Sequence, residues 1–335
     1  MYLTLLIISL IQLTTTITNA DTQCPIVSQS IKNNTIISNF RLVQYNVEWL
    51  FTDYYSNSKC PGSGCPWANT SQAFTHMDYV SNVIEKLNPD YINLCEVEGC
   101  DELNQLNNLL NSNYKPYLIK GTDTSTGQNV GLLTKIDPNL NLYRDESRIE
   151  YPISNSQCGY VGNSSTTGLS KHYITEMTIN KYNVAIIGLH LLAYPTDPSR
   201  CAQREAQALI VQNIINKYLD LEYEIIVIGD LNDYDGEILD ANNSKPTSQV
   251  LQILKTNDKL KSISNFISQD QRYTCWWDQD ESCKSSPNEF SMIDHILLTP
   301  NLYLHVNSAF VYHGYDEFCG TLNSDHYPVI VDFVF

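Results

Sequence analysis

Short apolar runs alternate with helical patterns along most of the chain. Runs rich in β-branched and aromatic residues predict strands at 41–47, 91–95, 130–133, 173–179, 184–189, 225–229, 293–298, 302–312 and 328–331. Apolar residues at helical spacing predict helices at 74–87, 103–110, 200–219 and 248–255. Strands outnumber helices, and helices separate only some of them. This order favours an α/β fold in which two sheets pack face to face with helices outside.

Polar residues stand where several of these apolar runs end. Asp230 and Asn232 follow the run IIVIG, and Asp325 and His326 precede the run PVIV. Apolar runs of this length are typical of buried strands, so the polar residues should lie where a sheet ends and a site can open. A carboxylate, an amide and a His–Asp pair at one point provide the groups for metal-assisted attack on a phosphate.

Residues 1–20 resemble a secretory signal peptide. They contain an apolar stretch, a Thr-rich stretch and a small residue at Ala20, and they carry no charged side chain. The apolar stretch is shorter than the roughly 20 residues that a membrane-spanning helix needs. A buried N-terminal strand is the alternative interpretation. We therefore expect one domain over 21–335, with no transmembrane segment.

The cysteines and glycosylation motifs agree with secretion. All ten cysteines lie after residue 20, and no zinc-type CxxC pair is present, so disulfides are the better interpretation. Spacing favours the local pairs Cys60–Cys65 and Cys275–Cys283 but cannot decide connectivity. Glycosylation motifs stand at Asn33, Asn69, Asn163 and Asn242. The expected location is extracellular, or the lumen of the endolysosomal system.

The charge of the chain limits its partners. The formal net charge is −17, and all of it lies after the leader. Proteins that bind nucleic acid tightly usually carry a basic surface, so no stable nucleic-acid complex is expected. Transient hydrolysis is still compatible with this charge, because a divalent cation and a few basic groups can hold a phosphate. We expect a monomer.

Six segments in this order resemble the endonuclease/exonuclease/phosphatase superfamily, which has the deoxyribonuclease I-like fold. The segments are QYNVEWLF, INLCEVEG, IIGLHLLA, IVIGDLND, MIDHILLT and SDHYPV. They extend over nearly the whole chain after the leader. The resemblance implies a four-layer α/β sandwich with two mixed sheets and a metal-dependent phosphoesterase activity.

The resemblance also implies a set of metal ligands. Glu96, at a predicted strand end, offers the hard oxygen that Mg²⁺ prefers. Asn46 is expected to contact the metal shell or the phosphate, and Asp325 to complete that shell. The expected cofactor is Mg²⁺ or Mn²⁺, with Ca²⁺ as a further possibility. A carboxylate and amide set suits a hard cation better than zinc.

The catalytic roles are implied in the same way. Asp230 is the candidate for positioning or deprotonating the attacking water, and Asn232 could donate to the phosphate. His190 and His326 are expected to contact the scissile phosphate as an acid or a hydrogen-bond donor. Asp294 is the implied partner that orients His326.

Three features leave questions open. Related deoxyribonucleases pair the second catalytic His with an acid, whereas this chain offers Gln128 and Asn129 in the comparable stretch. Glu48 could join the site or cap a turn. Trp276 and Trp277 could stack on bases or enter a lipid interface. Packing of a disulfide-closed loop is the favoured interpretation for this tryptophan pair.

Three functions are compatible with these observations. The first is a secreted, metal-dependent nuclease that hydrolyses phosphodiester bonds by in-line attack of an activated water. The second keeps this chemistry but acts on a lipid phosphodiester, as sphingomyelinase-like members do, or on a phosphomonoester. The third is a secreted binding protein that retains the fold without catalysis. The first is the expectation adopted here.

Overall fold

The computed structural model describes residues 23–25, 27, 37–52, 65–315, 319 and 321–335. The predicted leader, the motif at Asn33 and Cys60 lie outside these residues. No helix in these ranges is both long enough and apolar enough to cross a membrane.

Two mixed sheets form the body of the structure. The larger has seven strands in the order β1-β4-β5-β3-β2-β16-β15, and the smaller has five in the order β11-β14-β10-β9-β8. The larger comprises β1 (Gln23–Cys24), β2 (Asn39–Leu50), β3 (Tyr91–Val97), β4 (Lys115–Ile119), β5 (Asn129–Thr134), β15 (Val306–Val311) and β16 (Val329–Val334). The smaller comprises β8 (His172–Ile179), β9 (Tyr182–His190), β10 (Glu224–Asp230), β11 (Lys261–Ser262) and β14 (Asp294–Leu298). The pairs β2–β3 and β9–β10 are parallel, and the other pairs within these sheets are antiparallel.

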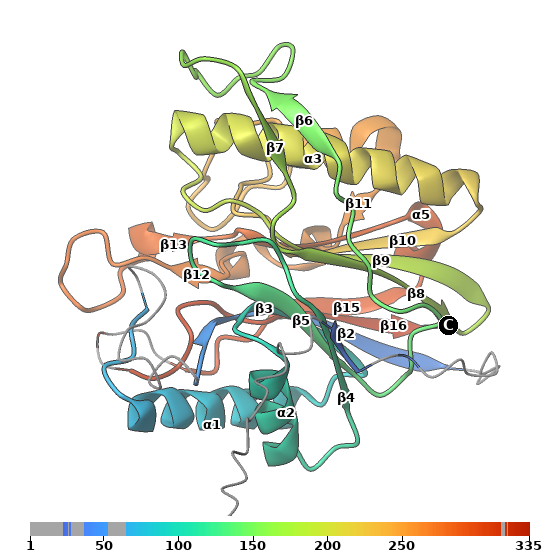
Figure 1. Ribbon diagram of the computed structural model, residues 1–335, viewed down its shortest axis with the longest axis vertical. Helices are drawn as coiled ribbons and strands as arrows, with labels where there is room; N and C mark the ends of the chain where they lie inside the picture. Colours follow the sequence, from blue (N-terminus) through green and yellow to red (C-terminus); the bar gives the residue numbers. More distant parts are fainter. Residues whose placement is uncertain (1–22, 26, 28–36, 53–64, 316–318, 320) are drawn as a thin grey trace, which may run out of the picture.

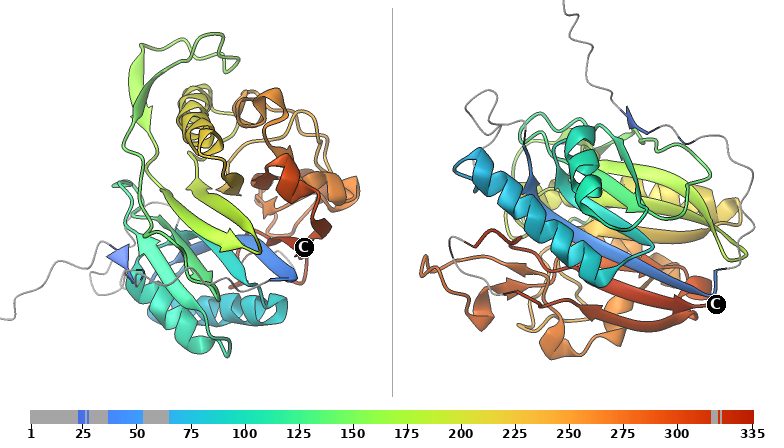
Figure 2. Two further views of the ribbon diagram at one scale, coloured as in Figure 1. Left: turned by 90° about the vertical axis from the view of Figure 1, so that its right-hand side faces the viewer. Right: turned by 90° about the horizontal axis from the view of Figure 1, so that it is seen from below.

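The two sheets pack face to face, and helices cover their outer faces (Figure 1). A core cluster that includes Leu42, Leu132, Ile186 and Ile228 joins the inner faces. The outer helices are α1 (Thr70–Leu87) and α2 (Cys100–Leu109) on the larger sheet, and α3 (Pro198–Asp220) and α4 (Val250–Leu254) on the smaller. Figure 2 shows the same layers from two other sides. The predicted four-layer α/β sandwich is confirmed.

The central strands are almost wholly buried because each sheet is covered on both faces, whereas β4, β11 and β15 are partly exposed. Every residue of β5 and of β14 is buried, and so are all but the first residue of β10. A strand buried on both faces needs a continuous run of apolar residues, not an alternation of apolar and polar residues. One boundary prediction was wrong: the segment expected to be a strand from residue 302 begins inside the short helix α5 (Pro300–Tyr303), and β15 starts only at Val306.

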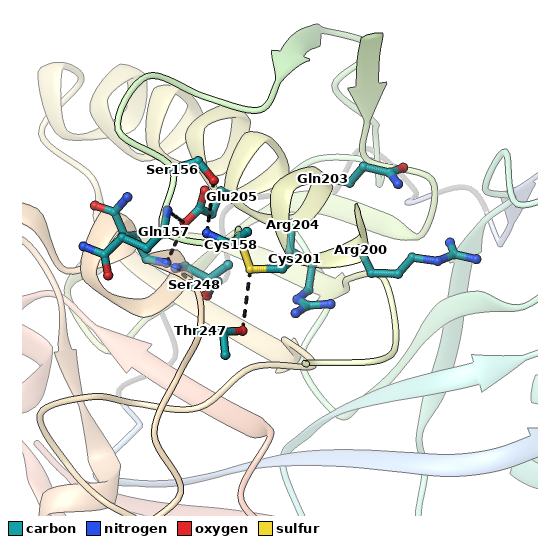
Figure 3. The surroundings of a disulfide bond; sticks show 12 residues. Ser156, Gln157, Cys158, Arg200, Cys201, Gln203, Arg204, Glu205, Thr247 and Ser248 are labelled. Atoms are coloured by element: carbon teal, nitrogen blue, oxygen red, sulfur yellow. Dashed lines mark hydrogen bonds between the residues drawn. A yellow bond between two sulfur atoms is a disulfide. The ribbon is translucent and has the colours of Figure 1, made fainter. Parts of the chain in front are cut away.

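Short paired strands complete the fold. β6 (Arg148–Tyr151) pairs with β7 (Ser165–Gly168), and β12 (Cys275–Trp276) pairs with β13 (Phe290–Ser291). A disulfide between Cys158 and Cys201 connects the β6–β7 loop to α3, and the Thr247 hydroxyl donates to the Cys201 sulfur (Figure 3). The disulfide holds the β6–β7 hairpin against α3, which covers the smaller sheet.

The cysteine pairing differs from the local pairs that spacing favoured. Cys283 bonds to Cys319, not to Cys275, and a third disulfide joins Cys24 to Cys100. Within the described ranges, Cys95 and Cys275 are not in disulfides. The prediction failed because Cys275 lies in β12 and is buried, whereas Cys283 lies in an exposed loop beside Cys319. The pair Cys60–Cys65 stays a prediction.

Candidate active site

The predicted site residues gather at one rim of the sandwich, where strands of both sheets end or begin. In the smaller sheet, Asp230 at the end of β10 is paired in register with His190 of β9 on one side and with Asp294 of β14 on the other. In the larger sheet, Asn46 and Glu96 lie near the ends of the parallel strands β2 and β3. The carboxyl ends of parallel strands meet at one edge, so these residues converge.

Asn46 connects the two sheets across the rim. Its side-chain amide donates to Glu96 Oε1 at 3.2 Å and to Asp230 Oδ2 at 3.0 Å. The other Glu96 oxygen accepts from the Trp49 backbone at 3.1 Å. Pairing between β2 and β3 slips between Asn46 and Leu50, and Glu96 has a φ of 68°. Left-handed backbone in a non-glycine residue is unfavourable and concentrates at functional sites.

Asp294 and His326 form a buried dyad. His326 Nδ1 lies 2.7 Å from Asp294 Oδ2, and the other Asp294 oxygen accepts from the Gln44 amide at 2.9 Å. This contact fixes the ring so that Nε2 is directed away from Asp294. Burial lowers the pKa of His326, but the neighbouring Cys275, Asp294 and Asp325 outweigh burial and hold the pKa well above its ordinary value. The charged imidazolium is therefore the favoured form.

Burial and neighbouring acids favour the uncharged form of Asp230, in contrast to the charged form of His326. Burial raises the pKa of Asp230 to about 7, and the charge of Asp294 adds to the rise. The Asn232 backbone donates to Asp230 Oδ1 at 2.8 Å and limits that rise. Asn232 has a φ of 49°, and its side-chain amide donates to the Leu191 carbonyl at 3.2 Å. Asn232 therefore shapes the turn that presents Asp230, and its contact with the phosphate stays a prediction.

Glu48 lies in the site. Its carboxylate accepts from the Asp325 backbone at 3.0 Å, and its own backbone donates to the Asn46 side chain at 3.1 Å. Burial, then the charges of Asp325 and Glu96, raise the pKa of Glu48 well above its ordinary value. Asp325 is the more open of these groups, with 41% of its side chain exposed. Glu48 thus holds Asp325 at the mouth of the site.

The donor set fits a divalent cation. The carboxylates of Glu48, Glu96, Asp230, Asp294 and Asp325 act on one another electrostatically, and Lys171 and His326 lie among them. The excess of negative charge and the hard oxygen donors suit Mg²⁺ or Mn²⁺. One oxygen each from Asp230 and Asp294 and one nitrogen of His326 lie within 4.8 Å of one another. Which of these residues bind the cation stays a prediction, as do Asn46, Glu96 and Asp325 as ligands.

Lys171 is a site residue that was not predicted from the sequence. Its amine lies 3.2 Å from Gln128 Oε1 and 3.3 Å from His190 Nε2, and the residue is only 7% exposed. An ammonium has donors only, so Nε2 of His190 accepts from it when the imidazole is neutral; the same nitrogen lies 3.6 Å from Asp230 Oδ2. Burial and then the Lys171 charge lower the pKa of His190 well below its ordinary value. Lys171 therefore lies between His190 and Gln128, the residue that stands where related deoxyribonucleases have an acid.

Other candidates have structural roles. His295 bonds to the Asp233 carbonyl at 2.9 Å, and the fully buried Arg204 pairs with the Asp233 carboxylate at 3.0 Å. Gln207 donates to the Gly168 carbonyl at 3.0 Å. These contacts are those of scaffolding residues. Together they fix the turn after Asp230.

Trp276 and Trp277 have different environments, one buried and one exposed. Trp276 is 9% exposed and donates from its indole to Glu289 at 3.0 Å, so packing accounts for it. Trp277 is 64% exposed. Cys275, two residues before Trp277, forms a backbone bridge with His326, which places this loop beside the dyad. Packing explains Trp276 but not Trp277.

Comparisons with known proteins agree with this geometry. The sequence pattern of the Endonuclease/Exonuclease/phosphatase family matches residues 43–326. A search of the curated proteins found no significant match. Two packed sheets with acid, amide and imidazole groups at one rim define a phosphoesterase. The chain belongs to the endonuclease/exonuclease/phosphatase family and is a phosphoric ester hydrolase.

Solved structures share the fold. An endonuclease/exonuclease/phosphatase family protein from Leptotrichia buccalis is 14% identical, with a TM-score of 0.55 over 88% of this chain and 100% of that one. A mannosyl-6-phosphatase from Bacteroides thetaiotaomicron is 16% identical, with a TM-score of 0.53 over 88% and 100%. TDP2 from C. elegans is 16% identical, with a TM-score of 0.50 over 89% and 75%. Identities this low support the fold alone.

Proposed function

We propose that this chain is a secreted, divalent-metal-dependent nuclease that cuts phosphodiester bonds by in-line attack of water. The observation that carries the proposal is the arrangement around Asp230, with His190 and Asp294 on either side and the Asp294–His326 dyad directed into the rim. An acceptor with a pKa near neutrality and a protonated imidazole are the pair that hydrolysis requires. Three disulfides support an oxidising compartment.

The residues divide the work in this proposal. Asp230, whose pKa is about 7, accepts a proton from the attacking water. His326, oriented by Asp294, donates to the leaving oxygen or to a phosphoryl oxygen. Lys171 donates to another phosphoryl oxygen and offsets its charge. A Mg²⁺ or Mn²⁺ ion bound by Glu96, Asn46 and Asp325 would neutralise charge on the phosphoryl group.

A polar groove beside the site supports a hydrophilic substrate. It has a volume of about 210 Å³ and is lined by Thr122, Asp145, Glu146, Arg148, Thr167, Gly168, Leu169, Ser170, Leu192, Gln203 and Gln207. Ser170 precedes Lys171, and Leu192 follows His190 by two positions, so the groove adjoins this side of the rim. The lining is polar, with the carboxylates of Asp145 and Glu146 beside its hydroxyls, amides and one guanidinium, and it suits a polar substrate better than an acyl chain.

A supercoiled plasmid tests the proposal. We expect nicking with Mg²⁺ or Mn²⁺, and a loss of roughly a hundredfold or more in Asp230→Asn because the proton acceptor is removed. Asp220→Asn is the matched control, since Asp220 is an exposed acid at the end of α3. Absence of nicking with every divalent cation, for DNA and RNA alike, would refute the nuclease assignment.

A lipid phosphodiesterase is the second candidate, and the exposed Trp277 favours it. An indole that is 64% exposed beside a catalytic rim can enter a membrane interface. Phosphocholine release from sphingomyelin vesicles measures this activity. Release that falls in Trp277→Ala, while hydrolysis of a small soluble phosphodiester is unchanged, would favour the lipid substrate. Plasmid nicking without phosphocholine release would favour the nuclease.

A further inference from the structure

Cys275 is a buried thiol beside the dyad. It is 8% exposed and is not in a disulfide, although the other described cysteines apart from Cys95 are. Its strand β12 forms a backbone bridge with His326, and the Trp276 backbone donates to the Asp325 carbonyl at 2.9 Å. Sγ of Cys275, a carboxylate oxygen of Asp325 and a ring nitrogen of His326 lie within 4.8 Å of one another.

We propose that Cys275, Asp325 and His326 form an inhibitory site for a borderline-soft divalent cation of the Zn²⁺ class. The inhibition rests on the proposed function, because His326 is its target. The binding site itself rests only on the three side chains.

The ligand types select this cation. Thiolate, imidazole and carboxylate are the zinc ligands of proteins, whereas Mg²⁺ takes oxygen. In a tetrahedral site with metal–ligand bonds of about 2.0–2.3 Å, neighbouring ligand atoms lie roughly 3.3–3.8 Å apart. Nε2 of His326 and Oδ1 of Asp325 lie 3.9 Å apart, close to that spacing. Small side-chain rotations therefore bring the three ligands to one ion.

The support around His326 is that of a metal ligand. Zinc-bound imidazoles usually donate through their second nitrogen to a carboxylate, which fixes the ring and raises its basicity. Asp294 is at 2.7 Å from His326 Nδ1 and leaves Nε2 for the ion. Asp325, 41% exposed, offers the route of entry from solvent.

Binding would stop catalysis in two ways. The Cys275 thiol becomes the thiolate ligand and the His326 imidazolium becomes a neutral ligand through Nε2, so each gives one proton to solvent and two H⁺ leave for each Zn²⁺ bound. The ion occupies Nε2 of His326, which then cannot donate to the substrate. It also takes an oxygen of Asp325 away from the proposed Mg²⁺ shell. A water molecule fills the fourth position, as in other open zinc sites.

Cobalt tests the site without relying on activity. Co²⁺ added to the full-length protein with its disulfides intact, in Mg²⁺, should give a thiolate-to-cobalt charge-transfer band in the near ultraviolet. Cys275→Ser and Cys275→Ala should both lose the band. Cys95→Ala is the matched control, since Cys95 is the other buried thiol of the described ranges, and it should keep the band. A band that survives both Cys275 substitutions, or no band in the unsubstituted protein, would overturn the proposal.

Inhibition gives the second readout. We expect the Zn²⁺ concentration for half-inhibition at fixed Mg²⁺ to rise at least tenfold in Cys275→Ser, the usual size of a lost ligand-shell contact. Equal inhibition of both proteins would assign zinc to the Mg²⁺ ligands and refute this inhibitory site. If the unsubstituted protein hydrolyses no phosphoester, the proposed function fails, whereas the cobalt band still decides whether the metal site exists.

Discussion

The two imidazoles of the rim have opposite environments. His326 is held by a carboxylate, which favours its charged form, and His190 is held by an ammonium, which favours its neutral form. Both rings are buried and stand at strand ends. The residue type is therefore the same, and the partner decides which ring can donate a proton. On the side of His190, the Lys171 amine lies beside Gln128 and His190.

The largest effect on activity should come from removing the carboxylate that holds His326 in its charged form. Asp294→Asn keeps the size of the side chain but no longer favours the imidazolium of His326, so kcat should fall roughly a hundredfold or more. Steady-state hydrolysis of the best substrate measures the change. The control is Asp332→Asn, an acid remote from the rim that pairs with Arg41. A loss of less than about threefold would show that the dyad is not needed.

Removing the ammonium beside the neutral His190 should reduce activity less. Lys171→Met removes the ammonium from His190, and kcat/KM should fall roughly tenfold because one phosphate contact is lost. Lys171→Arg should recover part of that loss. The ring of His190, followed by NMR in the metal-free protein, should also titrate at a higher pH in Lys171→Met. An unchanged titration would contradict the contact that separates the two imidazoles.

Restoring the missing acid would sharpen the comparison. Gln128→Glu gives the Lys171 amine an ionic partner where it now has an amide at 3.2 Å. The ammonium would then be shared with a carboxylate, and we expect kcat/KM to fall by about threefold as its hold on phosphate weakens. Inorganic phosphate binding, measured by calorimetry, should weaken by a similar factor. Tighter phosphate binding would show that Lys171 does not contact the anion.

The smallest effect concerns stability. Asp230 has a pKa raised to about 7 in the folded chain, so its contribution to stability is full below pH 4 and is lost as the pH rises through about 7. Asp230→Asn should therefore raise the Tm of the metal-free protein at pH 8 by roughly 2 °C or more, and by less than half as much at pH 5. Differential scanning calorimetry at both pH values tests this. An equal change in Tm at pH 8 and at pH 5 would contradict the electrostatic cause.

Local patterns were enough for the long strands and helices, but not for the short strands β1, β4, β6, β7, β11, β12 and β13. Apolar runs and helical spacing depend on near neighbours in the chain, and β10 and α3 follow from them with bounds close to those predicted. The strand-end positions of Asp230, Asp294 and Glu96 follow in the same way. The sequence and its resemblance together also named the partner of His326.

Contacts between distant segments were decided by the tertiary structure. Lys171 meets His190 because β8 and β9 are antiparallel neighbours, and Cys275 meets His326 through a backbone bridge over 51 positions of sequence (326 minus 275). Neither pair leaves a periodic signal in the sequence. The apolar pattern therefore determined which elements form and where their polar ends lie. Packing of the two sheets and their loops decided which imidazole faces a carboxylate, which faces an amine, and which cysteine remains a thiol.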